Sequence, residues 1–159
     1  MKKLDNRGFT LTELIVVIAI IGILAGVASA SINQIFSNQT RKFINDCDAM
    51  LTRCRVETLS GAPSNTFVEL RLDDSDGKYY VALYKGGSKI EEEPLKSSSA
   101  SCTYCIAGGS PVPFDDEGDS LRISYNRTTG AMNENYTEIS VGNSKITLVP
   151  ATGYHKVGG

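Results

Sequence analysis

Four cysteines are the residues of this chain best suited to chemistry, and they fall into two pairs. Cys47 and Cys54 lie seven positions apart in a stretch with helical periodicity, so they share nearly one face but lie about 10.5 Å apart along the axis. A disulfide between them would require the helix to unwind, because disulfide-bonded Cα atoms lie within about 7 Å of each other. Cys102 and Cys105 form a Cys-x-x-Cys sequence in a segment without a clear pattern.

Three kinds of chemistry are open to these cysteines. The first is disulfide formation, in two possible arrangements: Cys102 and Cys105 each bond to a helix cysteine, or they bond to each other while Cys47 and Cys54 stay buried thiols. The second is that the cysteines are buried free thiols. The third is a four-thiolate zinc site, since a Cys-x-x-Cys and a helical pair can converge on one ion. Disulfides are favoured if this part of the chain lies outside the cell, where conditions are usually oxidising.

Acidic segments and one histidine are weaker candidates. Residues 73–77 begin like a calcium loop, but no acidic residue follows at the spacing that closes an EF-hand, so a solvated hairpin turn is expected. A second acidic cluster at 115–119 is typical of a solvated face. His155 lies in a glycine-rich C-terminal tail with no orienting carboxylate evident, so a surface role or none is expected. We expect no enzyme activity and no cofactor.

A long apolar run dominates the N-terminal part of the chain. From Phe9 to Ala30 there are 22 residues with a single charge, Glu13. As a helix this run reaches roughly 33 Å, about the thickness of the hydrocarbon core of a bilayer. Three basic residues precede it, so the positive-inside rule predicts a single pass with the N-terminus in the cytoplasm and everything after residue 30 outside.

Two ordinary interpretations of this run are a cleavable secretory signal and an uncut signal anchor. The tripeptide at 28–30, Ala-Ser-Ala, fits the small-x-small cleavage rule, so a soluble domain released after Ala30 is one alternative. Neither interpretation explains Glu13, because a carboxylate near hydrocarbon is costly and usually has a partner. The position of Glu13 therefore indicates a third interpretation.

The residues around Glu13 have a recognisable pattern. Residues 7–14, Arg-Gly-Phe-Thr-Leu-Thr-Glu-Leu, lead into an aliphatic run, and this string resembles the leader and first helix of type IV prepilins and of pseudopilins from type II secretion and DNA-uptake machines. The resemblance implies that a prepilin peptidase cuts after Gly8 and that the new N-terminal residue, Phe9, is methylated. Many family members have a helix-kinking proline where this chain has Ala30, so no kink is implied.

The resemblance also gives Glu13 a role in assembly. A new amine at Phe9 is a cation, and the Glu13 carboxylate of a neighbouring subunit can neutralise it among apolar helices, which would fix the stagger. The implied partners are copies of this chain or other pilins, the prepilin peptidase, an assembly ATPase, platform proteins and the membrane. Some pseudopilins bind calcium in a late loop. The weak calcium candidates here are Asp115, Asp116, Glu117 and Asp119.

The function implied by the resemblance is a structural subunit of a type IV pilus or a type II secretion-like pseudopilus. It would lie first in the cytoplasmic membrane and then in a pilus at the cell surface. A minor tip adhesin or cargo-binding pilin is an alternative that shares the leader. Direct nucleic-acid binding by the head is not expected, because removal of residues 1–8 leaves 13 basic and 17 acidic residues and no basic cluster.

The expected fold is α+β and pilin-like, with a long N-terminal helix packed on a small antiparallel sheet of about four strands. Apolar residues at three- and four-residue steps continue the helix to about residue 60, where Gly61 and Pro63 signal its end. The expected domains are a leader at 1–8, a transmembrane and filament-core helix at 9–30, an amphipathic helix at 31–62 and a β-rich head at 63–159.

Strand patterns fill most of the expected head. Residues 66–72 and 78–84 flank the acidic turn and predict a hairpin. Residues 86–118 are rich in Ser, Gly and Pro and predict a long irregular excursion packed on the sheet. The three later strands are expected at 121–125, 137–141 and 145–149.

Overall fold

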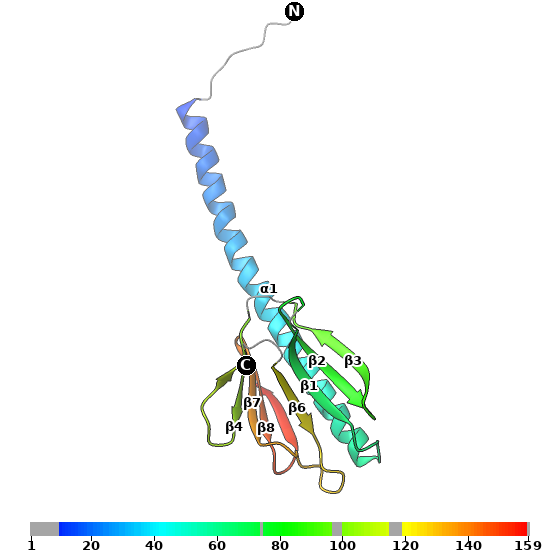
Figure 1. Ribbon diagram of the computed structural model, residues 1–159. Helices are drawn as coiled ribbons and strands as arrows, with labels where there is room; N and C mark the ends of the chain where they lie inside the picture. Colours follow the sequence, from blue (N-terminus) through cyan, green and yellow to red (C-terminus); the bar gives the residue numbers. More distant parts are fainter. Residues whose placement is uncertain (1–9, 74, 97–99, 115–118, 159) are drawn as a thin grey trace, which may run out of the picture. The chain divides into compact units, whose positions relative to one another are not determined.

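The computed structural model describes residues 10–73, 75–96, 100–114 and 119–158, without the side chains of residues 28–33. The chain divides into two compact units, Met1–Ile35 and Phe36–Gly159. The boundary falls inside one helix, α1 (Leu11–Leu59), which is blue to green in Figure 1. The helix predicted from about residue 10 to about residue 60 is confirmed.

Each end of α1 is capped. At its start, the Thr10 hydroxyl accepts a hydrogen bond from the Glu13 backbone N–H at 3.2 Å, and the Glu13 carboxylate accepts one from the Thr10 backbone N–H at 2.9 Å. This reciprocal pair is a capping box. At its end, the Ala62 N–H donates to the Glu57 carbonyl at 2.9 Å across Gly61, whose φ is +95°. The geometry is that of a Schellman motif, which only a residue tolerant of positive φ can close without strain.

Four antiparallel strands form the first sheet of the head. Asp73 and Lys78 are the register pair next to the predicted hairpin turn. The Gly77 N–H closes that turn by donating to the Asp73 carbonyl at 2.9 Å, so the predicted turn is confirmed. In the order β3-β2-β1-β6, the strands are β1 (Phe67–Asp73), β2 (Lys78–Lys85), β3 (Ser88–Pro94) and β6 (Ser120–Ser124).

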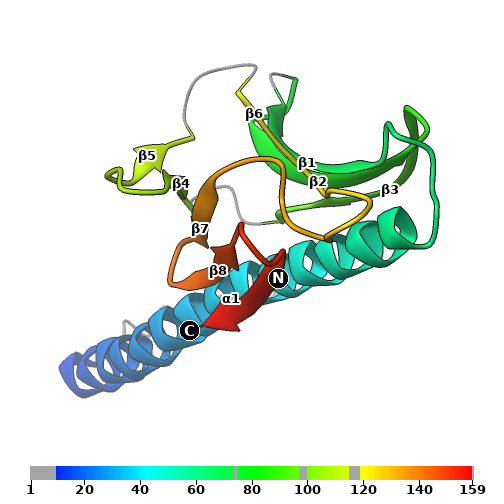
Figure 2. The ribbon, with the colours of Figure 1, turned by 90° about the horizontal axis from the view of Figure 1, so that it is seen from below.

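Five antiparallel strands form the second sheet. Figure 2 shows β8 and β9 lying over the helix within the head. β5 has two residues, and its Pro113 suits the edge position because proline has no N–H for a ladder. In the order β5-β4-β7-β8-β9, the strands are β4 (Cys102–Ile106), β5 (Val112–Pro113), β7 (Tyr136–Val141), β8 (Ser144–Val149) and β9 (Tyr154–Gly158).

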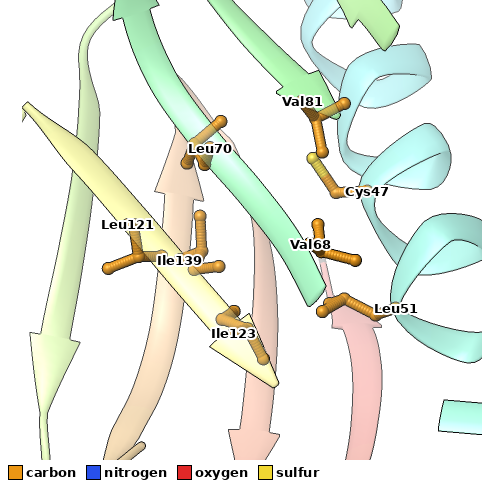
Figure 3. Close-up of a pocket in the computed structure, with 8 residues that line it drawn as sticks. All are labelled: Cys47, Leu51, Val68, Leu70, Val81, Leu121, Ile123 and Ile139. Atoms are coloured by element: carbon orange, nitrogen blue, oxygen red, sulfur yellow. The ribbon is translucent and has the colours of Figure 1, made fainter. Parts of the chain in front are cut away.

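The core of the head lies between α1 and the two sheets. On β8, buried and exposed residues alternate along the whole strand, as expected for a sheet with one buried face. Cys47 and Leu51 of α1 face Val68 and Val81 of the first sheet across an apolar cavity of about 10 Å³ (Figure 3), which is too small for a ligand. The helix contributes Phe43, Ile44, Cys47, Met50, Leu51 and Cys54 to this core. The α+β, pilin-like fold is confirmed.

Two predictions about the strands are wrong. The single sheet of about four strands is, in the described residues, nine strands in two sheets. The segment 86–118, predicted as irregular, contains β3, β4 and β5. β3 has no apolar alternation because its glutamates face charged partners: Glu91 lies 2.9 Å from Arg53 of α1 and Glu92 lies 3.1 Å from Arg71 of β1. Hydrophobic periodicity does not predict a strand whose side chains form ion pairs instead of packing in the core.

Candidate functional site

The first described turn of α1 holds Glu13, the residue expected to act in assembly. Its Oε2 accepts two hydrogen bonds at 2.9 Å, one from the Thr10 backbone N–H and one from the Thr10 hydroxyl. The side chain is exposed. Its carboxylate also lies at the helix N-terminus, where the macrodipole favours negative charge. Glu13 is therefore oriented as an anion within its own chain before any neighbour is present.

Apolar side chains cover α1 after Glu13, and they are exposed to solvent. Their exposed fractions run from 45% at Val17 to 69% at Ile23. A helix that is apolar around its circumference is stable only where apolar neighbours surround it. The exposed residues are Leu14, Ile15, Val16, Val17, Ile18, Ile20, Ile21, Ile23, Leu24 and Val27.

In the part of the chain that the structure describes, no helix is both long enough and apolar enough to cross a bilayer.

One family model matches the chain, and its match falls on this segment. Residues 3–29 match the prokaryotic N-terminal methylation motif. The chain carries a prepilin-type methylation motif. No curated protein and no solved structure matches the chain. The motif supports a type IV pilin-like or pseudopilin-like protein, and it favours a structural role over an enzymatic one.

The methylation motif covers residues 3–8 of the expected leader, Glu13 and all the exposed apolar residues named above. Gly8 and Phe9, the residues expected on either side of the cleaved bond, lie outside the described residues, as does the rest of the leader. Cleavage after Gly8 and methylation of Phe9 therefore stay predictions. Within the motif, the structure describes the hydrogen bonds between Thr10 and Glu13.

All four cysteines are free thiols in the structure. Cys47 and Cys54 lie on α1 and Cys102 lies on β4, and all three are buried in the core of the head. Cys105 is half-buried on β4. Burial is the main cause that raises the pKa of Cys54 and of Cys102, each to about 12. These thiols are therefore protonated near neutral pH and are poor nucleophiles in the folded head.

The candidate metal sites lie partly outside the described residues. Asp115, Asp116 and Glu117 are not described. Asp119 is half-buried and directly precedes β6. Among the described residues, no group of three or more His, Cys, Asp or Glu side chains is placed to hold a metal ion. Calcium binding at 115–119 stays an untested prediction.

His155 is not a surface residue, contrary to the prediction. Its side chain is only 7% exposed, and its Nε2 lies 3.0 Å from the Thr52 hydroxyl and 3.6 Å from Asp48 Oδ1 on α1. The glycine-rich tail, for which no strand was predicted, forms β9, which pairs with β8. His155 therefore packs the last strand onto the helix, a structural role that requires the tertiary fold.

Two residues with clear roles were missed from the sequence. Thr10 could have been found, since Thr10-x-x-Glu13 fits the capping-box pattern before an apolar run. Arg55 gave no local signal: its guanidinium donates to the backbone carbonyls of Gly130 at 3.2 Å and Thr152 at 2.8 Å, both distant in the sequence.

Proposed function

We propose that this chain is a structural subunit of a type IV pilus or a type II secretion-like pseudopilus, polymerised through its N-terminal helix. One observation carries the proposal. The methylation motif at residues 3–29 coincides with a helical segment whose large apolar side chains are exposed, while the core-facing apolar side chains of the same helix from Phe43 to Cys54 are buried in the head. An exposed apolar segment of this size needs lipid or like helices around it.

Processing is the first step of the proposed function. In this proposal Lys2, Lys3 and Arg7 hold the N-terminus on the cytoplasmic side. The apolar run from Phe9 to Ala30, which extends beyond the described side chains at both ends, crosses the membrane once. A prepilin peptidase removes residues 1–8 and the amine of Phe9 is methylated. The head then lies outside the cytoplasmic membrane.

Assembly is the second step, and it moves the helix from lipid into a filament core. An assembly ATPase and a membrane platform, both implied by the resemblance, supply the work. Lipid and like helices are similarly apolar, so the transfer itself involves little hydrophobic gain and depends on packing. Return of the assembled helix to water is costly, because each large apolar side chain loses about 1.5–3 kcal/mol on full exposure. The filament is therefore stable once it leaves the membrane.

Glu13 sets the stagger between subunits in this proposal. The Phe9 amine of an incoming subunit is a cation in a medium of low dielectric constant, where an unpaired charge is strongly disfavoured. Thr10 holds Oε2 of Glu13 through two hydrogen bonds. A carboxylate offers about four acceptor sites, so the Glu13 group retains acceptor capacity for the amine.

The intact mass and N-terminal sequence of the protein recovered from cells test the proposal. A chain that begins with methylated Phe9, found in the membrane and in sheared filaments, is the expected result. A chain that begins at Ser31 and is found in the medium would show that the apolar run is only an export signal, and polymerisation through this helix would then be impossible. An uncut chain would contradict peptidase processing.

A further inference from the structure

The fold limits which cysteines can bond to each other. On α1, Cys47 and Cys54 are separated by about 10.5 Å of helical rise, beyond the reach of a disulfide. On β4, Cys102 and Cys105 are three positions apart, which puts them on opposite faces and about 10 Å apart along the strand. Any disulfide within one chain must therefore join α1 to β4.

Cys105 and Cys54 are poorly placed for such a bond. Cys102 is only 1% exposed and faces the core, so strand alternation turns Cys105 to the other face, where it is half-buried next to a register shift at Ile106. Cys54 lies further along α1, and the side chains that act on its thiol are Thr58, Glu57 and Glu134 rather than a cysteine.

Cys47 and Cys102, by contrast, belong to the same part of the core. Cys102 pairs in register with Val141, and a Cβ built on the next residue, Gly142, would lie 3.3 Å from Thr40 Cγ2. Thr40 is buried on α1 seven residues before Cys47, so the two share nearly one helix face and lie about 10.5 Å apart along the axis. The end of β4 that carries Cys102 therefore lies on the face of α1 that carries Cys47.

The electrostatics of the thiols agree with this placement. Burial is the largest cause that raises the pKa of Cys47 well above its usual range, and the next cause is the charge that Cys102 would carry as a thiolate. Both cysteines belong to the same buried core cluster of the head. The effect of Cys102 on Cys47 agrees with that placement, because charge effects are strong between groups that share a low-dielectric interior.

We propose that Cys47 and Cys102 form a disulfide that ties α1 to β4, while Cys54 and Cys105 remain thiols. In the cell this step rests on the proposed function, which places the head in an oxidising exterior. The oxidant is a disulfide on another molecule, either the disulfide form of a small thiol compound or the disulfide form of a thiol–disulfide oxidoreductase. The two half-reactions remove two electrons and two protons from the cysteines and convert the external disulfide into two thiols.

The bond forms while the head is folding. The Cys47 thiolate attacks the external disulfide and releases one thiol; the Cys102 thiolate then attacks the Cys47 sulfur and releases the second. Both cysteines are buried and protonated in the folded head, and the thiolate is the reactive form, so folded reduced protein reacts slowly.

Peptide mapping of the full chain tests the proposal. The reduced, denatured chain is refolded in detergent with oxidised and reduced glutathione, denatured again, alkylated with N-ethylmaleimide and digested with trypsin without reduction. We expect two alkylated cysteines per chain and a link between peptide 43–53, which contains Cys47, and peptide 97–122, which contains Cys102 and Cys105. Reduction should release the two peptides.

Matched serine variants identify the strand cysteine. The link should persist in Cys105→Ser and disappear in Cys102→Ser. Four alkylated cysteines in the wild-type chain, a link to peptide 54–55, or a link that survives Cys102→Ser would each overturn the proposal. All four cysteines follow residue 31, so a protein cut after Ala30 would defeat the proposed function and leave this mapping result unaffected.

Discussion

Arg55 of α1 donates a hydrogen bond from Nη2 to the backbone carbonyl of Thr152, 97 positions later in the chain, at 2.8 Å. Its Nε donates to the carbonyl of Gly130 at 3.2 Å. One helix side chain thus joins the loop after β6 to the turn between β8 and β9. The helix and both sheets of the head depend on each other at this point.

Arg55→Ala should destabilise the head by about 1–3 kcal/mol, because two carbonyls lose a charged donor. Chemical denaturation of the full chain in detergent measures the change. Arg41→Ala, a matched substitution at an exposed position of the same helix, should change the free energy of unfolding by less than about 0.5 kcal/mol. Equal losses in the two variants would show that the Arg55 contacts add nothing to stability.

Gly153→Ala should destabilise the head more than glycine replacement elsewhere. A Cβ at this position would overlap the Gly130 carbonyl oxygen, and the backbone φ is +67°. Gly108 has a similar φ of +77° but nothing within 4 Å of a built Cβ, so Gly108→Ala isolates the cost of the backbone conformation, about 1–3 kcal/mol. Thermal denaturation of both variants should show the larger drop for Gly153→Ala; the reverse order would contradict the close approach.

Glu13→Gln should leave processing largely intact and impair filament assembly. A glutamine can still complete the capping box with Thr10, so this variant removes the charge and keeps the cap. Glu13→Ala removes both. The yield of sheared filaments from cells that express only the variant is the measurement. Normal filaments from Glu13→Gln would show that charge neutralisation does not set the stagger between subunits. A defect confined to Glu13→Ala would show that Glu13 acts only by capping the helix.

Gly8→Val should block removal of the leader, because the branched side chain adds bulk at the residue before the cut. Western blotting and intact mass of the membrane fraction distinguish precursor from mature chain. Gly22→Val, a matched change within the apolar run, should leave cleavage unaffected. Mature protein of normal mass from Gly8→Val would overturn the leader assignment.

Acid should destabilise the head between about pH 4 and pH 2, partly through Asp73. The hydroxyl and backbone N–H of Ser75, together with Arg71, lower the pKa of Asp73 from 3.8 to about 2. A carboxyl whose pKa is lower in the folded state stabilises the fold above its unfolded pKa, and this stabilisation is lost as pH falls through the folded pKa. Asp73→Asn should flatten the acid limb of a plot of unfolding free energy against pH.

Ser75→Ala provides the companion test, since it removes one donor and keeps the Asp73 carboxylate. The acid transition should then move to higher pH. An acid limb that is identical in the wild type and in Asp73→Asn would show that other groups account for the acid sensitivity.

Local patterns in the sequence were enough to predict the helix and the β1–β2 hairpin. The end of α1 has its glycine at Gly61, and the hairpin has Gly77 in a turn between two apolar strands, so each element is specified by residues near it. The motif at residues 3–29 likewise lies in consecutive residues. Signals of this kind can be read without knowledge of tertiary contacts.

β3 and β9 could not be predicted in this way, because distant partners stabilise them. Lys42 and Arg53 of α1 lie 3.7 Å and 2.9 Å from Glu93 and Glu91 of β3. His155 of β9 meets Thr52 of the helix, more than one hundred positions earlier. The same limit applied to the cysteines: spacing left several pairings open, and the opposite faces of Cys102 and Cys105 on β4 became known only with the strand assigned.

The position of the first core residue on α1 has a consequence for how such a protein can diversify. Among the described residues of α1, the buried hydrophobic side chains begin at Phe43, while the exposed large apolar side chains before it continue to Phe36 and the boundary between the two units follows Ile35. Demands on folding and demands on assembly therefore fall on separate residues of a single helix. A genetic crossover within 37–39, after exposed Phe36 and before buried Thr40, could exchange one head for another and keep the polymerising segment unchanged.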